Sequence, residues 1–222
     1  MGGRREEILD AALAIADEHG LEAVSMRAVA ERVGVTPMAL YRHVSGKAAL
    51  LDAVVGRLLA AFLPPDAGED QGWEERLGAL AHACRNATQR HPWAAQLLFS
   101  RPAVTPDAVR AVDVIYTALI EAGVPDRDVP RLERLISTFV IGFAASEASG
   151  RFAPGTLDPR SRRGRLPEGD LPGHHRLAPW LDLPVDLTTE FEADLDDIVR
   201  LIKTCVTTSP VSATTPRPGG RR

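Results

Sequence analysis

The fold of this chain is decided by residues 25–47, which read SMRAVAERVGVTPMALYRHVSGK. Ser25 can cap a helix over residues 26–33, because its hydroxyl can accept a hydrogen bond from an otherwise unpaired N–H of the first turn. Gly34 follows that helix, and glycine adopts the left-handed conformation that commonly ends one. The stretch therefore opens with a short helix that has a defined start and a defined end.

A second helix follows the glycine directly. Thr36 supplies its N-cap, and Pro37 suits the first helical position, where a missing N–H is no loss. Leu40 and Val44, four residues apart, turn one side of this helix inward. Two helices joined by a tight glycine-containing turn match the helix-turn-helix motif, whose second helix lies in the DNA major groove. An ordinary corner between two packed helices gives the same pattern.

The residues that the inward faces leave over favour the DNA-binding interpretation. Met38, Tyr41 and Arg42 are expected to face outward, and His43 and Lys47 follow them closely. Arginine can read guanine edges in the major groove, and the other polar groups suit phosphate oxygens.

Lys47 gives the sharpest argument. It lies in the first turn of the next predicted helix, residues 46–62, where the helix dipole favours anions and a cation has the wrong sign. The chain has only one other lysine, Lys203. An external anion such as a backbone phosphate, held jointly by helix N–H groups and the ammonium, accounts for this placement. The alternative is a solvated surface lysine.

The run VSMRAVAERVGVTPMALYRHVSGKAALLDAVV, residues 24–55, resembles the DNA-binding segment of TetR-family transcriptional regulators. The resemblance rests on an Ala-x-x-x-Gly-Val core, a Leu-Tyr-x-His recognition segment and a lysine that opens the following helix. It implies that Arg27 reaches the DNA, that residues of the second helix lie at the groove, and that two residues contact phosphates. The residues so implied are Arg27, Thr36, Pro37, Met38, Tyr41, Arg42, His43 and Lys47.

The overall charge does not indicate a nucleic-acid partner, but its distribution does. The 222 residues have a formal net charge of −4. Residues 23–47 nevertheless contain four Lys and Arg residues against one Glu. Local placement of charge decides nucleic-acid binding, so the acidic total does not exclude it.

Other function classes find little support. The two cysteines, Cys84 and Cys205, are too few for a disulfide framework or a zinc site and suit apolar packing in a reducing compartment. There is no nucleophile-elbow pattern, metal-ligand spacing or phosphate loop, so we expect no enzyme, no cofactor and no metal. The N-terminus lacks the apolar region of a signal peptide, and no run is long enough to span a bilayer. We expect a cytoplasmic protein with no membrane partner.

The remaining pattern is helical, which predicts an all-α protein in two parts. A first helix over residues 4–19 braces the helix-turn-helix at 25–44, and these form a DNA-binding domain over residues 1–62. Residues 63–206 form a larger helical effector-binding and dimerisation domain. Its helices are predicted at 73–90, then a short one that ends at about 99, and further ones at 105–123 and 131–149. The last helix begins at a capping box of Thr188 or Thr189 with Glu192.

Two segments stand apart from this pattern. Residues 151–187 are rich in proline and glycine and carry clustered arginines, so we expect a mobile loop without regular structure, either a lid over a ligand site or an insertion without function. His174 and His175 lie in it, and we treat them as loop residues rather than as an indication of a metal. Residues 207–222 are expected to be a disordered tail.

The helix at 131–149 and the last helix show more apolar surface than one chain needs. Paired with the same helices of a second copy they would form a four-helix bundle and a two-fold homodimer. The alternative is that both stripes are internal core, and the family resemblance favours the dimer. The predicted interface residues are Leu132, Ile136, Phe191, Leu195, Ile198 and Ile202.

By the same resemblance, the larger domain would hold a pocket for a small-molecule effector. Apolar walls with a few polar handles are typical of such pockets. The candidates, each of which could instead be core or surface, are His82, Arg85, Asn86, Trp93, Phe99, Tyr116, Phe139 and Phe143. The predicted function is a transcriptional regulator, a repressor released from a palindromic double-stranded DNA operator by the effector; the alternative is a DNA-binding protein controlled by a protein partner.

Overall fold

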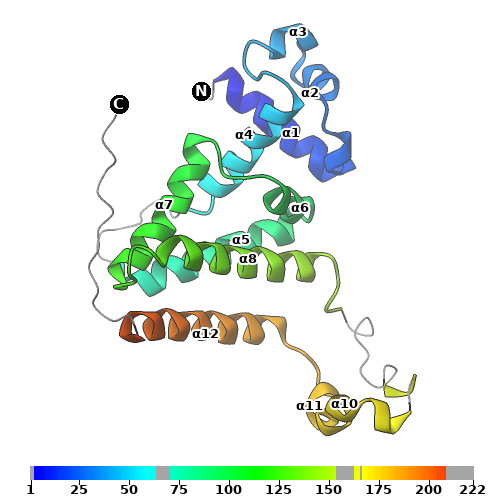
Figure 1. The fold of residues 1–222 in the computed structure, drawn as a ribbon. Coiled ribbons are helices and arrows are strands. Elements are labelled where there is room, and N and C mark those ends of the chain that lie inside the picture. The colour runs from blue at the N-terminus through cyan, green and yellow to red at the C-terminus, as the bar shows by residue number, and fades with distance from the viewer. Residues whose placement is uncertain (1–2, 64–70, 154–162, 166, 209–222) are drawn as a thin grey trace, which may run out of the picture.

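The computed structural model describes residues 3–63, 71–153, 163–165 and 167–208, and within these ranges it contains helices and no strand (Figure 1). The all-α prediction is therefore confirmed. The elements are α1 (Arg4–His19), the 3₁₀ turn η1 (Leu21–Ala23), α2 (Met26–Val33), α3 (Pro37–Leu40), α4 (Lys47–Ala60), α5 (Trp73–Arg90), α6 (Trp93–Ser100), α7 (Pro106–Glu121), α8 (Val129–Ala148), the 3₁₀ turn η2 (Glu168–Asp170), α10 (Pro172–Arg176), α11 (Ala178–Leu181) and α12 (Leu187–Thr208).

Helices α1, α2 and α3 pack in sequence, and α1 also packs on α4; we call this unit the head (Figure 1). Its centre is formed by the fully buried side chains of Ile8, Val29, Leu40 and Leu50. The predicted boundary at residues 62 and 63 adjoins residues 64–70, which lie outside the described ranges, so the domain division stays a prediction.

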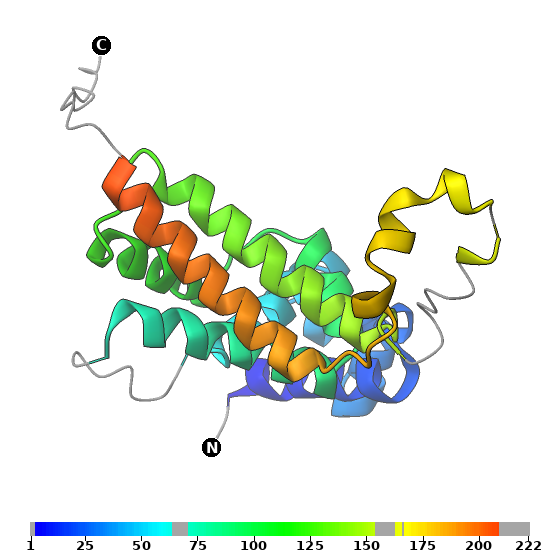
Figure 2. The same ribbon diagram turned by 90° about the horizontal axis from the view of Figure 1, so that it is seen from below.

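Helices α5, α6, α7, α8 and α12 form the second unit, the body. Figure 2 shows α12 running alongside α8, so the last helix of the chain covers the body from one side. Among the described residues, no helix combines the length and the apolar character that crossing a bilayer requires.

Helix α4 belongs to both units, because it packs on α1 in the head and on α7 in the body. The two helices approach so closely at Gly56 that a Cβ placed there would overlap the side chain of Thr105. Thr105 is held in place as the N-cap of α7, where its Oγ1 accepts a hydrogen bond from Ala108 N at 3.3 Å. Glycine at position 56 is therefore what allows α4 to lie against the start of α7.

Most predicted helix limits are confirmed, and α1, α2 and α5 match theirs to the residue. The second helix of the helix-turn-helix is shorter than the pattern suggests: α3 ends at Leu40, and residues 41–43 form a turn. Helix α8 begins at Val129, two residues before the predicted start. The prediction from apolar spacing fails at these ends because spacing marks a buried face rather than the last hydrogen-bonded turn.

The predicted capping box of α12 is wrong. Asp186, one residue before the helix, is the cap: its Oδ1 accepts from Thr188 N at 3.0 Å and from Thr189 N at 3.4 Å. The Thr189 hydroxyl donates to Oδ2 of the same side chain at 2.8 Å. These hydrogen bonds, the one from Thr189 Oγ1 above all, lower the pKa of Asp186.

Where residues 151–187 are described, they contain regular structure, so the predicted loop without it is wrong for these parts. They contain η2, α10 and α11, which Figure 2 shows projecting beyond the ends of α8 and α12. Arg163 Nη2 binds both carboxylate oxygens of Asp182, at 2.6 and 2.7 Å, and so joins two ends of this segment. Residues 154–162 and 166, which include part of the arginine cluster, lie outside the described ranges, as do residues 209–222 of the predicted tail.

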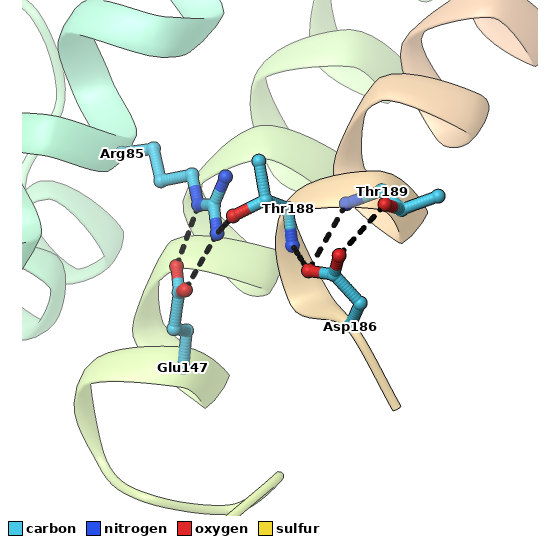
Figure 3. Close-up of polar contacts among 5 residues, drawn as sticks. All are labelled: Arg85, Glu147, Asp186, Thr188 and Thr189. Atoms are coloured by element: carbon cyan, nitrogen blue, oxygen red, sulfur yellow. Dashed lines mark hydrogen bonds and ion pairs between the residues drawn. The ribbon is translucent and has the colours of Figure 1, made fainter. Parts of the chain in front are cut away.

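A buried ion pair binds α12 to the body (Figure 3). Arg85 on α5 is only 7% exposed, and its Nε and Nη2 each donate to a carboxylate oxygen of Glu147 on α8 at 2.7 Å. Nη2 also approaches Thr188 Oγ1 on α12 at 3.4 Å, and the guanidinium carbon lies 4.9 Å from the ring centre of Phe191. The hydrogen bond from Arg85 lowers the pKa of Glu147. One guanidinium therefore connects three helices of the body.

We expect Glu147→Ala to lower the free energy of unfolding by roughly 3–5 kcal/mol, because it leaves the Arg85 guanidinium buried without its counter-charge. The pair depresses the pKa of Glu147 below its usual value of 4.5, so its contribution is complete above pH 4.5 and is lost as pH falls through the depressed pKa. Urea unfolding of both proteins, at one protein concentration and several pH values, should show a difference that shrinks only below pH 4.5.

The matched control is Asp197→Ala. Asp197 pairs with Arg200 on the exposed side of α12, and this change should alter stability by no more than about 0.5 kcal/mol. An equal effect of the two changes, or no pH dependence of their difference, would show that the buried pair does not stabilise the body.

Candidate functional site

The helix-turn-helix is built by local capping. Ser25 Oγ accepts from Ala28 N at 3.1 Å and starts α2, and Gly34 ends it with φ of 74° in the left-handed region. Thr36 Oγ1 accepts from Ala39 N at 3.3 Å and starts α3. These caps and the glycine fix where α2 begins and ends and where α3 begins.

The other side of this unit is open to solvent. Met38 is 76% exposed and Tyr41 50% exposed, although both are large apolar or aromatic side chains. All eight residues predicted to contact DNA are exposed: Arg27, Thr36, Pro37, Met38, Tyr41, Arg42, His43 and Lys47. Since α3 is short, Tyr41, Arg42 and His43 project from the turn that follows it. Their contacts with DNA stay a prediction.

The positive charge of this surface comes from fewer residues than the sequence suggests. Arg32 is held by Glu18, with its Nη1 donating to Oε2 at 2.8 Å and its Nη2 to Oε1. That hydrogen bonding lowers the pKa of Glu18. Within the described residues, Arg27, Arg42 and Lys47 form no ion pair, so these three cations remain available to an external anion.

Lys47 is the first residue of α4, and no side chain caps this helix. The first N–H groups of α4 and the Lys47 ammonium therefore occupy one exposed corner of the head. A negatively charged group placed there gains from the helix dipole and from the lysine together.

A second candidate site lies inside the body, as a cavity of about 220 Å³ between α4, α5, α6, α7 and α8. Its wall is apolar apart from a few groups. Burial raises the pKa of the Cys84 thiol to about 11, so the thiol is protonated and behaves as part of the apolar wall. The charged members of the wall are Arg101 and Glu133, and Ser137 supplies a hydroxyl.

Arg101 and the residue pair His91 and Trp93 connect the body with the head. Arg101 Nη1 donates to the carbonyl oxygen of Ala48 at 3.1 Å and to the carboxylate of Asp52, both on α4. Trp93 Nε1 donates to Asp17 Oδ1 on α1 at 2.7 Å, and His91 Nδ1 lies 2.6 Å from the same oxygen. The wall of the cavity is thus hydrogen-bonded to the helix that Lys47 begins.

The eight predicted effector residues do not lie in this cavity. Phe99 and Tyr116 line an open hollow of about 740 Å³ beside it, and Trp93 is bonded to the head as described. Arg85 and Phe143 belong to the ion-pair cluster, with His82 against Phe191 and Phe139 against Phe143. Asn86 is exposed. The cavity wall consists mainly of aliphatic side chains that nothing in the sequence separates from ordinary core, and contact with an effector stays a prediction for all eight.

The predicted dimer residues lie mostly inside the protomer. Leu132, Ile136, Phe191 and Ile202 are buried in its own core, so these four side chains have no surface left to offer a second copy. Leu195 and Ile198 are partly buried against the same core. The apolar side chains that α8 and α12 leave exposed are others, among them Leu135 and Leu201. For the four buried residues, the internal-core alternative describes the protomer.

The sequence is similar to known regulatory proteins along most of its length. Residues 8–54 match the domain family described as "Bacterial regulatory proteins, tetR family", and residues 64–170 match "Tetracyclin repressor-like, C-terminal domain". An HTH-type transcriptional regulator of Saccharopolyspora erythraea is 31% identical over 171 residues, which are 76% of this chain and 72% of that protein. The HTH-type transcriptional repressor DrrR1 of Streptomyces coeruleorubidus is 35% identical over 142 residues, 64% of this chain but only 53% of that protein.

The fold is also similar to solved structures. Apo ActR from Streptomyces coelicolor superposes with a TM-score of 0.78 at 26% identity, covering 93% of this chain and 98% of ActR. ActR in complex with actinorhodin gives a TM-score of 0.76 at 26% identity, over 93% of this chain and 99% of that one. Both the head and the body therefore have counterparts in one class of bacterial regulator, and the chain belongs to the TetR family of bacterial regulatory proteins.

Proposed function

We propose that this protein is a sequence-specific DNA-binding transcriptional repressor that acts as a homodimer and is released from its operator by a small molecule. The observation that carries the proposal is the exposed face of the helix-turn-helix, where Met38 and Tyr41 are open to solvent and three cations form no ion pair with the residues that the structure describes. Apolar and aromatic side chains next to cations suit a surface that contacts base edges with the former and phosphates with the latter. The family consists of regulators, and we infer that this chain likewise acts by binding rather than by catalysis.

On DNA, residues 36–42 would enter the major groove. Arg42 would read base edges, and His43 and Lys47 would bind backbone phosphates, with the uncapped N-terminus of α4 adding its dipole at the Lys47 site. Arg27, at the start of α2, would reach the neighbouring backbone. Such a segment contacts few base pairs, so recognition needs two heads about 34–36 Å apart on successive major grooves.

A two-fold dimer would supply the second head. Helices α8 and α12 lie side by side at one side of the body, and their outer surface retains exposed leucines at positions 135 and 201 (Figure 2). We infer that this outer surface, rather than the buried stripe, pairs with its copy to form the four-helix arrangement.

The cavity is the proposed effector site, supported by the ActR structure with actinorhodin. A ligand releases DNA only to the extent that it binds the non-DNA conformation more tightly. Val55 and Leu59 of α4 line the cavity, and Arg101 bonds to the same helix. A ligand there therefore contacts the helix on which the head is mounted.

Control by a protein partner is the second candidate. The projecting segment leaves Trp180 73% exposed, together with Leu177, Leu183 and Val185. Release of DNA by a protein extract fraction, with no response to a panel of small molecules, would favour this candidate over the cavity.

We expect Lys47→Ala to weaken binding to all DNA sequences about equally, because a phosphate contact carries no sequence information. The slope of log affinity against log salt concentration should become shallower by about 1 for each protomer. Binding to operator and random duplexes over a salt series measures both effects. Lys203→Ala, the only other lysine, is the control and should change neither; an unaltered slope in Lys47→Ala would refute the phosphate contact.

Arg42→Ala should behave differently. If Arg42 reads a base, its loss costs about 1–3 kcal/mol on the operator and flattens the preference at one position of each half-site. Competition among operator variants with single base changes measures that preference. A uniform loss across all variants would instead place Arg42 on the backbone.

We expect the double substitution Leu135→Arg and Leu201→Arg to give a folded monomer, because four charges would face each other across the two-fold axis without partners. Sedimentation measures the mass, and operator binding should become far weaker while a half-site still binds weakly. A dimer of unchanged stability would exclude this surface as the interface.

A further inference from the structure

Glu133 is a buried carboxylate in a mainly apolar wall. It lies on α8, is 9% exposed, and lines the cavity among aliphatic neighbours such as Ile136 and Val140. Burial of a charged group is unfavourable unless hydrogen bonds or an opposite charge compensate for it. Whether the protein itself supplies groups that compensate the Glu133 carboxylate therefore decides what this cavity can bind.

The partners of Glu133 are few. The Ser137 hydroxyl lies 3.1 Å from Glu133 Oε1, but it also lies 2.8 Å from the backbone carbonyl of Glu133. A hydroxyl has one proton, so it cannot serve both acceptors at full strength. The described residues place no cationic side chain within ion-pair distance of the carboxylate. Arg101, the cation in the same wall, is already bonded to Asp52 and to the Ala48 carbonyl.

The position of Glu133 is also specific. Four residues line both the inner cavity and the open hollow beside it: Arg101, Ala103, Val112 and Glu133. The carboxylate thus lies at the junction between the two spaces. A molecule entering from the hollow would place its apolar body in the cavity and one polar group beside Glu133.

We propose that the effector is an apolar, ring-containing molecule with a protonated amine, and that Glu133 is the group that binds this amine. The inference rests on the proposed function and names the ligand class of the same cavity. A cavity of about 150 Å³ with aliphatic and aromatic walls accepts benzene, so one of about 220 Å³ has room for a fused ring pair. An ammonium adds the attraction of opposite charges to its hydrogen bond with the carboxylate, whereas a hydroxyl donates a hydrogen bond without that attraction, so the site selects an ammonium over a hydroxyl.

The test uses three naphthalene probes of nearly equal shape: 1-naphthylmethylamine, 1-naphthalenemethanol and 1-naphthoic acid. Calorimetric titration of the full chain near neutral pH measures their affinities. The amine should bind about tenfold more tightly than the alcohol, because only the amine forms an ion pair with the Glu133 carboxylate, and the acid should bind more weakly than both.

Three variants identify the cause. Glu133→Gln should bring the amine to within about twofold of the alcohol, because the ion pair is lost while the amide oxygen still accepts a hydrogen bond from either probe. Glu75→Gln, an equal charge change at an exposed position of α5, should retain the preference. Ala103→Phe, which places a ring at the junction, should weaken all three probes.

The outcomes separate the inference from the proposed function. If the alcohol or the acid binds wild-type protein as tightly as the amine, or if Glu133→Gln keeps the preference, the amine assignment is wrong while the effector cavity stands. If no probe binds, or if Ala103→Phe changes no affinity, the cavity is not the ligand site, and both the effector part of the proposed function and this inference fail. The ranking of probes on the wild-type protein decides the matter even if a variant does not fold.

Discussion

Helix α4 is the element on which the two halves of this protein depend. Its first residue, Lys47, stands at the exposed corner of the head, and Val55 and Leu59 near its other end line the cavity of the body. An α-helix transmits displacement along its axis, because its backbone hydrogen bonds resist bending. A shift of its cavity end therefore also moves Lys47, and with it the surface proposed to contact DNA.

The body contains two buried carboxylates in opposite electrostatic situations. Glu147 is fully engaged by Arg85, and the pair ties α5 and α8 to α12 (Figure 3). The Glu133 carboxylate has only a shared partner, because the Ser137 hydroxyl that lies near it also lies near the backbone carbonyl of Glu133. Interior charges that are paired hold structure together, whereas an unpaired one costs stability unless another molecule compensates. Helix α8 thus carries one carboxylate, Glu147, that stabilises the fold and another, Glu133, that suits ligand binding.

Much of the head could be predicted from sequence because its structure is determined locally. Ser25, Gly34 and Thr36 act on residues within one helical turn, and their caps are present as predicted. The exposure of Met38, Tyr41 and Arg42 could be predicted from the same local periodicity. The end of α3 could not be read in this way, because Leu40 and Val44 are spaced as in a helix although a turn separates them.

The body was harder to predict because its sites depend on contacts between distant segments. Apolar spacing identified Leu132 and Phe191 as buried but not which surface buries them, and they lie in the protomer core. Arg85 and His82 looked like polar handles of a pocket, yet Glu147 and Glu192, far along the chain, are their partners. The cavity wall is made mainly of aliphatic residues that no motif distinguishes. Only Glu133 carried a signal, a charge within an apolar helix face, and it was not among the predicted effector residues.

The close contact at Gly56 bears on how such regulators can be recombined. Because a methyl group at this position would overlap the Thr105 side chain, the seam between head and body is a matched surface rather than a flexible joint. In a hybrid regulator that joins the DNA-binding helices of one relative to the body of another, both sides of this seam must therefore come from the same parent protein. A junction placed in the sequence between α3 and α4 keeps Gly56 with Thr105, whereas one placed after α4 separates them.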